Sequence, residues 1–360
     1  MKKEILFSYF PKLSHTKLKN LVSYFSSFEH AWEYIDNASA QKMNWSPELI
    51  EAFFSWKKNI SEEKIQSDLE RYGIHCVLRD DHDYPPLLKH ISDPPLCLFV
   101  RGNLSNIAFP LGVVGTRKIT PYGKIVTERL IEPLVHTGIT IVSGLALGID
   151  GLAHNLTLKA KGRTIAVLGG GVDTGTLHPS AHEKLAEKII EHGGAIISEY
   201  PPGTVPFVYS FPKRNRIIAG MTLGTLVIEA GEKSGSLITA QCALDYNREV
   251  FAVPQNITSE SSLGTNHLIK MGAKVVTQAE DILEVIQGTQ KIPSVSIEKI
   301  LVPQSPEEQK LLVWISHTPI HIDEVVKNSG IESRIVSSTL TLMEMRGDIK
   351  NIGGMMYITA

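Results

Sequence analysis

The sequence has few cysteines, no long apolar stretch and almost no net charge, and each shortage excludes a class of protein. Its three cysteines are far apart and form no Cys-x-x-Cys pair, which argues against a disulfide framework and a zinc finger. No apolar run approaches the roughly 18 residues of a membrane-spanning helix, and the N-terminus lacks the apolar core of a signal peptide. We therefore expect a cytoplasmic protein without membrane contact.

The balance of charge limits how the chain could bind nucleic acid. The formal net charge is −2 over 360 residues, so a nucleic-acid site would have to be a local basic patch on a nearly neutral body. Hydrophobic residues make up 42% and charged residues 21%, as in ordinary globular proteins, and the length suits two or three domains.

Sequence patterns divide the chain into four parts. Residues 1–75 have apolar residues at helical spacing, with ten basic and ten acidic residues, which predicts a small, neutral, all-helical domain. Residues 76–287 alternate short apolar runs with helical patterns, which predicts an α/β domain with a doubly wound, Rossmann-like parallel sheet. Residues 288–303 predict a linker. Residues 304–360 contain three helical patterns and a hairpin at Gly353-Gly354, which predicts a winged helix.

The individual elements are predicted from the length and period of the apolar pattern. Strands are expected at residues 96–100, 111–114, 140–143, 164–168, 195–198, 226–228, 250–253 and 274–276. Helices are expected at residues 122–136, 182–192 and 237–247, and in the last part at 306–315, 322–327 and 332–345.

A glycine and two basic residues follow the strand predicted at 111–114. Gly115 and Thr116 precede Arg117 and Lys118, and Thr120-Pro121 then has the pattern of a helix start. Because a helix N-terminus offers unpaired amides and arginine binds phosphate through two nitrogens, this turn is a candidate phosphate site. An ordinary strand-to-helix turn with a solvated arginine explains the pattern equally well.

Similar turns follow other predicted strands. Glycines there would let the backbone approach a ligand, although close packing of helix against strand explains them nearly as well. Several such turns at one sheet edge favour a ligand with several phosphates, and the absence of a Gly-x-x-x-x-Gly-Lys-Ser/Thr motif disfavours ATP hydrolysis. The candidate residues are Ser143, Gly144, Gly169, Gly170, Ser234, Gly235, Ser236, Thr265 and Asn266.

Residues 207–216 place aromatic side chains beside basic ones. Aromatic rings stack on bases and cations bind phosphates, which is how single-stranded nucleic acid is bound without sequence preference. The edge of a core followed by a solvated basic helix start remains the alternative. The candidate contacts are Phe211, Lys213, Arg214, Asn215 and Arg216.

Two pairs of residues have the spacing of metal ligands on a helix. Asp150 and His154, and likewise His178 and His182, are four residues apart. No third ligand has a clear spacing, and zinc needs three or four protein ligands, so we expect no metal.

Taken in order, these motifs resemble those of the DNA-processing protein A (DprA/Smf) family, in detail over residues 80–285. The matching runs are Tyr84-Pro85-Pro86-Leu87-Leu88, Val114-Gly115-Thr116-Arg117, Ser143-Gly144-Leu145-Ala146-Leu147-Gly148-Ile149-Asp150, Ala153-His154, Ser198-Glu199-Tyr200, Phe211-Pro212-Lys213-Arg214-Asn215-Arg216-Ile217-Ile218-Ala219-Gly220, Glu229-Ala230, Ser234-Gly235-Ser236-Leu237-Ile238-Thr239-Ala240 and Gly264-Thr265-Asn266.

The resemblance implies a protein that binds single-stranded DNA, protects incoming DNA and helps to load the RecA recombinase during natural transformation. It implies no enzymatic activity and no cofactor, a homodimer formed through the Rossmann-like domain, and single-strand-binding protein as a further candidate partner. Arg117 would be the phosphate-binding arginine, Phe211 a base-contacting ring and Arg214 a cation facing DNA. Residues 1–75 resemble a sterile-alpha-motif or helix-hairpin-helix domain.

The sequence departs from the family pattern in places. Val208 stands where some members carry lysine, and residues 178–182 differ from the family's Tyr-Pro-x-x-Asn. Residues 11–15 lack the glycines of a DNA-binding hairpin, so we expect no DNA contact there. Residues 303–360 contain five basic and seven acidic residues, which favours a protein contact or a weak DNA contact over sequence-specific binding of DNA.

The alternative to a binding protein is an enzyme on the same fold. A nucleoside-monophosphate phosphoribohydrolase would carry Gly-Gly-x-Gly-Thr before a catalytic glutamate, and residues 225–231 lack that run. Glu199 and Glu229 follow predicted strands and could act as catalytic carboxylates. They could also accept hydrogen bonds from loop amides, which we favour.

Overall fold

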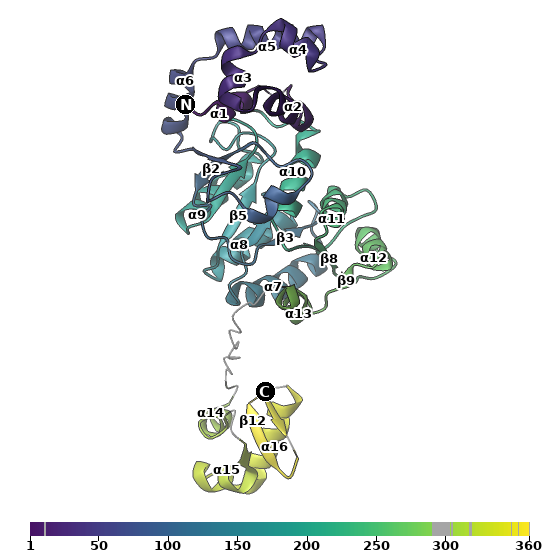
Figure 1. Ribbon diagram of the computed structural model, residues 1–360. Coiled ribbons are helices and arrows are strands. Elements are labelled where there is room, and N and C mark those ends of the chain that lie inside the picture. The colour runs from purple at the N-terminus through teal and green to yellow at the C-terminus, as the bar shows by residue number, and fades with distance from the viewer. Residues whose placement is uncertain are drawn as a thin grey trace. The chain divides into compact units, whose positions relative to one another are not determined.

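The computed structural model describes all residues except 11, 290–302, 304, 317–318, 347, 352 and 360. The chain divides into two units (Figure 1). The first contains the N-terminal helices and the large sheet, and the second contains the C-terminal helices and a small sheet. Among the described residues, no helix is long and apolar enough to span a bilayer.

One sheet of nine strands, counted over the described residues, forms the centre of the first unit. Seven of its strands are parallel, as expected for a Rossmann-like domain, and two antiparallel strands extend one edge. In spatial order the strands are β1 (His75–Leu78), β2 (Cys97–Gly102), β6 (Ala195–Ser198), β5 (Thr164–Val167), β4 (Ile141–Ser143), β3 (Leu111–Val114), β7 (Gly224–Val227), β8 (Glu249–Ala252) and β9 (Lys274–Val275).

The direction of winding reverses at β3. Strands β4, β5 and β6 follow on one side of β3, and β7, β8 and β9 follow on the other. Leu111 of β3 accordingly pairs with Ile141 of β4 and with Gly224 of β7. In open α/β sheets, ligands bind at the carboxyl ends of the strands where the order reverses, so the loops after β3, β4 and β7 mark the expected site.

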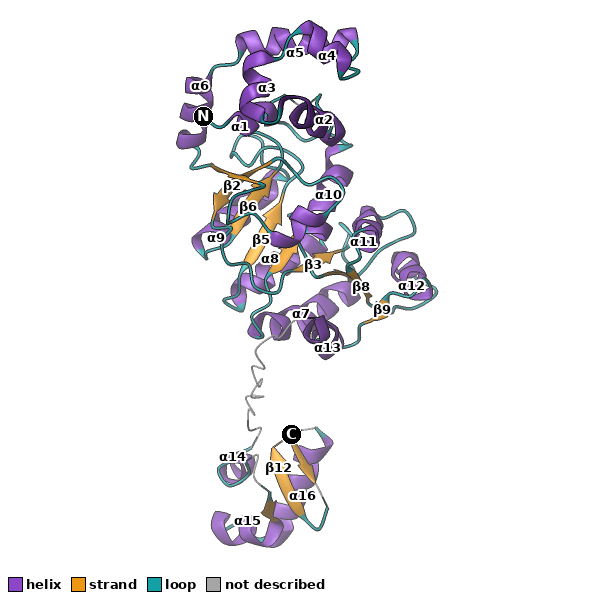
Figure 2. Cartoon of the chain, in the orientation of Figure 1, coloured by secondary structure: helices purple, strands orange, loops and turns teal. Residues whose placement is uncertain are grey.

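Helices cover both faces of the sheet (Figure 2). Successive side chains of β3 point to opposite faces, with Val113 in one apolar cluster and Val114 in the other. The first cluster includes residues of α7, α8 and α13, and the second includes residues of α10, α11 and α12. The bounds are α7 (Pro121–His136), α8 (Ile149–Lys159), α9 (Glu183–Glu191), α10 (Ser210–Gly220), α11 (Gly235–Asp245), α12 (Leu263–Lys270) and α13 (Glu280–Thr289), with 3-10 turns at Pro86–His90, Ser180–His182 and Glu260–Ser262.

The predicted N-terminal helices form around an aromatic core. Phe53 is fully buried at its centre and packs against the rings of Phe7, Phe10 and Trp45. Leu6 packs in a different cluster, together with Phe99 of β2, so the helices and the sheet share apolar contacts. The helices are α1 (Lys3–Ser8), α2 (His15–Phe25), α3 (Phe28–Tyr34), α4 (Asn37–Lys42), α5 (Pro47–Asn59) and α6 (Glu62–Arg71).

The second unit has the winged-helix layout expected from the sequence. A two-residue strand that the sequence did not predict joins the hairpin, giving the order β10-β12-β11. The first two residues of the predicted linker 288–303 are the last two residues of α13. Most of the linker lies outside the described residues. The elements are α14 (Pro306–Leu312), β10 (Ile320–His321), α15 (Ile322–Ser329), α16 (Ser333–Met345), β11 (Ile349–Asn351) and β12 (Met356–Thr359).

The aromatic core predicts the effect of truncating its central ring. Phe53→Ala should lower the free energy of unfolding by about 3–5 kcal/mol, because it removes buried surface and leaves a cavity among rings. Denaturant unfolding followed by tryptophan fluorescence measures this, since three of the four tryptophans lie in residues 1–75. Tyr34→Ala is the control, because Tyr34 is 62% exposed. Equal effects of the two substitutions would contradict the assignment.

Candidate functional site

A cavity of about 490 Å³ lies at the carboxyl edge of the sheet, beside the reversal at β3. The turn after β3, the loop leading into α8, the first turns of α10 and the N-terminus of α11 form its walls. We call it the cradle cavity. It is lined by Val114, Gly115, Arg117, Ala146, Asp150, Val208, Phe211, Pro212, Arg214, Asn215, Ile218, Ser234, Gly235, Ser236, Ile238 and Thr239.

The turn after β3 is fixed by the end of β7. The Thr116 amide donates to the Glu229 carbonyl at 2.7 Å, and the buried Glu229 carboxylate accepts from the Thr120 amide at 3.1 Å. Glu229 therefore bonds a loop amide at the start of α7, as favoured from the sequence. Arg117 is exposed above this turn, with its guanidinium carbon 5.5 Å from the centre of the Phe211 ring. The predicted phosphate turn thus forms one wall of the cavity.

Arg214 forms a second, buried cation of the cradle cavity. It is 5% exposed and donates to the Val167 carbonyl at 2.5 Å. Its guanidinium lies against Gly144, where a Cβ atom would overlap it unless the arginine side chain shifted. Burial lowers the pKa of Arg214 to about 10, and the nearby Asp150 carboxylate opposes that shift. Its Nε atom is enclosed by protein and finds no hydrogen-bond partner among the described residues.

Asp150 holds the loop that supports Arg214. Its carboxylate accepts from the Gly144 amide at 3.1 Å, and burial raises its pKa. The sequence singled out Asp150 as half of a possible ligand pair and as the last residue of the motif 143–150, and the structure shows that it stabilises the loop at the start of that motif.

The N-terminus of α11 completes the cavity. The Ser234 side chain accepts from the Ser236 amide, and the two hydroxyl oxygens are 2.8 Å apart. Asn215 donates to the Gly235 carbonyl at 3.2 Å, which ties α10 to α11. The positive end of the α11 helix dipole and two arginines make the cavity suited to a phosphate group.

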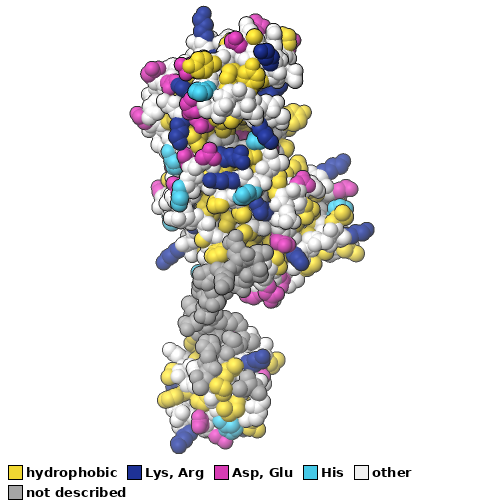
Figure 3. All heavy atoms as spheres, in the orientation of Figure 1, with side chains coloured by type: hydrophobic (Ala, Val, Ile, Leu, Met, Phe, Trp, Pro, Cys, Tyr) yellow, Lys and Arg dark blue, Asp and Glu magenta, His cyan; other side chains and the backbone are white. Residues whose placement is uncertain are grey.

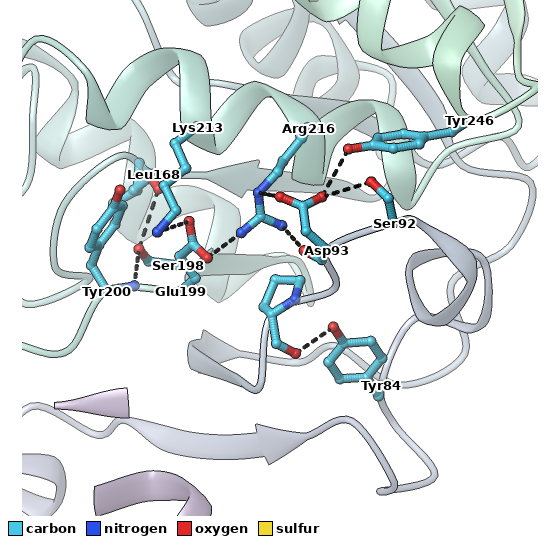
Figure 4. A network of polar contacts seen from close by, with 11 residues as sticks. Tyr84, Ser92, Asp93, Leu168, Ser198, Glu199, Tyr200, Lys213, Arg216 and Tyr246 are labelled. Atoms are coloured by element: carbon cyan, nitrogen blue, oxygen red, sulfur yellow. Dashed lines mark hydrogen bonds and ion pairs between the residues drawn. The ribbon is translucent and has the colours of Figure 1, made fainter. Parts of the chain in front are cut away.

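Arg216 lies in an internal network (Figure 4). It forms ion pairs with the Glu199 carboxylate and, at 3.1 Å, with the Asp93 carboxylate, and its side chain is 9% exposed. Lys213 lies 3.6 Å from the same Glu199 but is 54% exposed. The sequence suggested that all the cations of this segment face a ligand. The segment is instead the start of a helix packed on most sides, which turns Arg216 inward and leaves Lys213 at the surface.

Four other predicted site residues do not line the cavity: three are packed in the interior and one is exposed. Ser143 is buried and donates to the Val113 carbonyl, while Gly169 packs against Phe211 and Gly170 against Pro206. Lys118 is exposed but does not line the cavity.

Thr265 and Asn266 are also separate from the cavity. Thr265 is buried and donates to the Ser262 carbonyl at 3.1 Å, and Asn266 bonds both backbone polar groups of Gln255. These two residues fasten the loop after β8. The structure therefore shows structural hydrogen bonds for both residues, and neither lines the cradle cavity.

Charge on the visible face of the first unit is mixed. Figure 3 shows basic and acidic side chains interspersed there. This agrees with the near-zero net charge of the chain. The two arginines of the cradle cavity, Arg117 and Arg214, are therefore a local concentration of positive charge.

The fold and the cavity define a Rossmann-like protein with two arginines and an aromatic ring at the carboxyl edge of its sheet. The family described as DNA recombination-mediator protein A matches residues 75–287, and the DprA winged helix domain matches residues 299–355. The chain belongs to the DNA recombination-mediator protein A family.

Individual relatives agree with this assignment. Protein Smf of Escherichia coli K12 is 38% identical over 330 residues, which cover 89% of this chain and 87% of the relative. The solved structure of DprA from Streptococcus pneumoniae has a TM-score of 0.68 at 33% identity, over 79% of this chain and 98% of that one. A Helicobacter pylori structure, described by the single-stranded DNA binding mode of its DNA processing protein A, has a TM-score of 0.54 at 28% identity, over 61% and 97% of the two chains.

The network of Figure 4 predicts different effects for two neighbouring cations. Arg216→Met should lower the free energy of unfolding by about 3–5 kcal/mol, because it leaves the Glu199 carboxylate buried without its main partner. Lys213→Met, at an exposed pair with the same carboxylate, should cost less than about 1 kcal/mol. Chemical denaturation of both variants measures the difference. A loss with Lys213→Met as large as that with Arg216→Met would be inconsistent with this arrangement.

His154 predicts a pH dependence of stability. It is fully buried, its Nδ1 atom lies 2.7 Å from the Thr164 hydroxyl, and burial, with the nearby His182 and Arg214, lowers its pKa to about 3. The folded state then binds fewer protons than the unfolded state, so this contribution to stability is complete above pH 6.5 and is lost as the pH falls from 6.5 towards 3.

The test compares wild type with His154→Gln between pH 6.5 and 4. The stability deficit of the variant should shrink on acidification, by up to about 1.4 kcal/mol per pH unit, because only the wild type must keep this imidazole neutral. Urea unfolding at each pH measures it, and a deficit that does not change with pH would refute the prediction.

Proposed function

We propose that this chain is a recombination mediator that binds single-stranded DNA through the cradle cavity. The observation that carries the proposal is that Arg117, the buried Arg214 and the N-terminus of α11 line one cavity, with the Arg117 guanidinium over the Phe211 ring. Cations and a helix N-terminus suit the backbone phosphates of a strand, and the half-buried Phe211 ring offers a surface to an unstacked base. Neither contact depends on base identity, so we infer binding without sequence preference.

Family membership supports the same conclusion. The Helicobacter pylori relative is described by its single-stranded DNA binding mode, and its structure covers 61% of this chain. By this likeness we further propose protection of incoming DNA and help in loading RecA during natural transformation, which would place the protein in the cytoplasm. A homodimer formed through the Rossmann-like domain and contact with single-strand-binding protein belong to the same proposal.

We propose a binding role without catalysis. Glu229 lies in the stretch that corresponds to the catalytic glutamate of a phosphoribohydrolase. It is fully buried and accepts a hydrogen bond from the Thr120 amide. Glu199 is paired with Arg216 and Lys213. Both carboxylates therefore have structural partners, which supports a protein that binds its nucleic acid unchanged.

The proposal predicts a specific loss with Arg117→Ala. Affinity for a single-stranded oligonucleotide should fall about tenfold or more, because a charge-assisted contact to phosphate is removed. The slope of log affinity against log salt should decrease by about 0.7, the value of one phosphate contact on a single strand. Fluorescence anisotropy over a salt series, with single- and double-stranded oligonucleotides of the same length, measures both.

Arg129→Ala is the matched control, because Arg129 is an exposed arginine of α7 that does not line the cavity. It should leave both affinity and salt slope nearly unchanged. Absent binding, equal binding of single and double strands, or equal losses in the two variants would each overturn the proposal.

A further inference from the structure

A second cavity adjoins the cradle cavity on the other side of Phe211. Its volume is about 420 Å³, within the range that small ligands occupy. We call it the outer hollow. It is lined by Gly175, Thr176, Leu177, His178, Val205, Pro206, Phe207, Val208 and Phe211.

The outer hollow presents apolar side chains to solvent. Val205, Phe207 and Val208 are 71%, 51% and 78% exposed. None of the lining residues is acidic, so nothing in the hollow would repel a nucleic acid. A contiguous exposed apolar patch of this kind marks a binding surface more often than a lone exposed residue does.

The loop that carries these side chains is fixed from within. Its Phe207 amide donates to the Ser210 hydroxyl at 3.1 Å, and that hydroxyl donates back to the Phe207 carbonyl at 2.7 Å. The Phe207 and Tyr200 rings also form a T-shaped contact, with centres 6.2 Å apart. A second tie joins the Gly171 amide to the Thr204 carbonyl at 2.8 Å. The exposed ring is therefore held in place before any ligand arrives, which lowers the entropy cost of binding.

Phe211 connects the two cavities. Arg117 lies 5.5 Å from the centre of its ring, and the His178 ring lies 5.9 Å from it. The cradle cavity lies over the ends of β3 and β4, and the outer hollow is built by the loops after β5 and β6, which are the next strands of the sheet. A chain that alternates phosphates and bases along the sheet edge would therefore meet a cationic site and then an apolar one.

We propose that the outer hollow is a nucleobase subsite, which takes an unstacked base of the strand whose phosphate lies in the cradle cavity. Phe207 supplies a stacking face, and Val205 and Val208 supply apolar contacts that accept any base. This inference rests on the proposed function and assigns it a second binding element. Continuity with the cradle cavity selects a base over a segment of protein as the occupant.

The test separates base contacts from phosphate contacts. Binding of fluorescein-labelled oligothymidylate is compared with binding of an abasic sugar-phosphate oligomer of the same length. Phe207→Ala should weaken oligothymidylate binding at least about fivefold, the loss that follows removal of one stacking ring, and leave abasic binding unchanged. Phe207→Tyr should retain wild-type affinity for both, because it keeps the ring.

Tyr209→Ala is the control, because Tyr209 is 80% exposed, two residues away, and lines neither cavity. It should change neither affinity by more than about twofold. Thermal unfolding of all variants should match wild type, since these side chains are exposed.

The outcomes distinguish the two proposals. Wild-type protein that does not bind oligothymidylate overturns both. Wild-type binding that depends on Arg117 but is the same in Phe207→Ala overturns only the base subsite. An equal loss of oligothymidylate and abasic binding in Phe207→Ala also overturns it, because the ring would then act on the backbone or on the fold.

Discussion

The buried guanidinium of Arg214 is the contact on which the arrangement of the site depends. It reaches from α10 to the Val167 carbonyl at the end of β5 and lies against Gly144, the residue after β4. Asp150 supports it by binding the Gly144 amide. A charge in this position is costly to bury unless it has partners, so strand ends, loop and helix are constrained together. The same helix carries Phe211 and Lys213, and their positions follow from this anchor.

The network around Arg216 holds α10 on its other side. Its pairs with Glu199 and Asp93 join α10 to the end of β6 and to the loop before β2. Glu229 has the corresponding role at the reversal point, where it fixes the turn that presents Arg117. Buried polar groups thus determine where the exposed ones point, and the two cavities share Phe211 and Val208 because α10 and its preceding loop are held between these anchors.

The sequence was sufficient for the architecture and for part of the site. Fully apolar runs predicted the parallel strands, and Gly115 to Arg117 was predicted as a turn at their carboxyl edge, where the structure has it. The edge strand β1 was not predicted, because its four residues mix His75 and Cys76 with two apolar residues. The inward direction of Arg214 and Arg216 could not be predicted, because their partners Val167, Glu199 and Asp93 are distant in sequence and a basic run ordinarily indicates solvent.

The most direct test of the account is a crystal structure of the chain with a bound oligothymidylate. The account predicts a backbone phosphate in the cradle cavity, within hydrogen-bond distance of the guanidinium groups of Arg117 and Arg214, and a base against the Phe211 ring. A strand bound elsewhere on the chain, with no phosphate near either arginine, would contradict it.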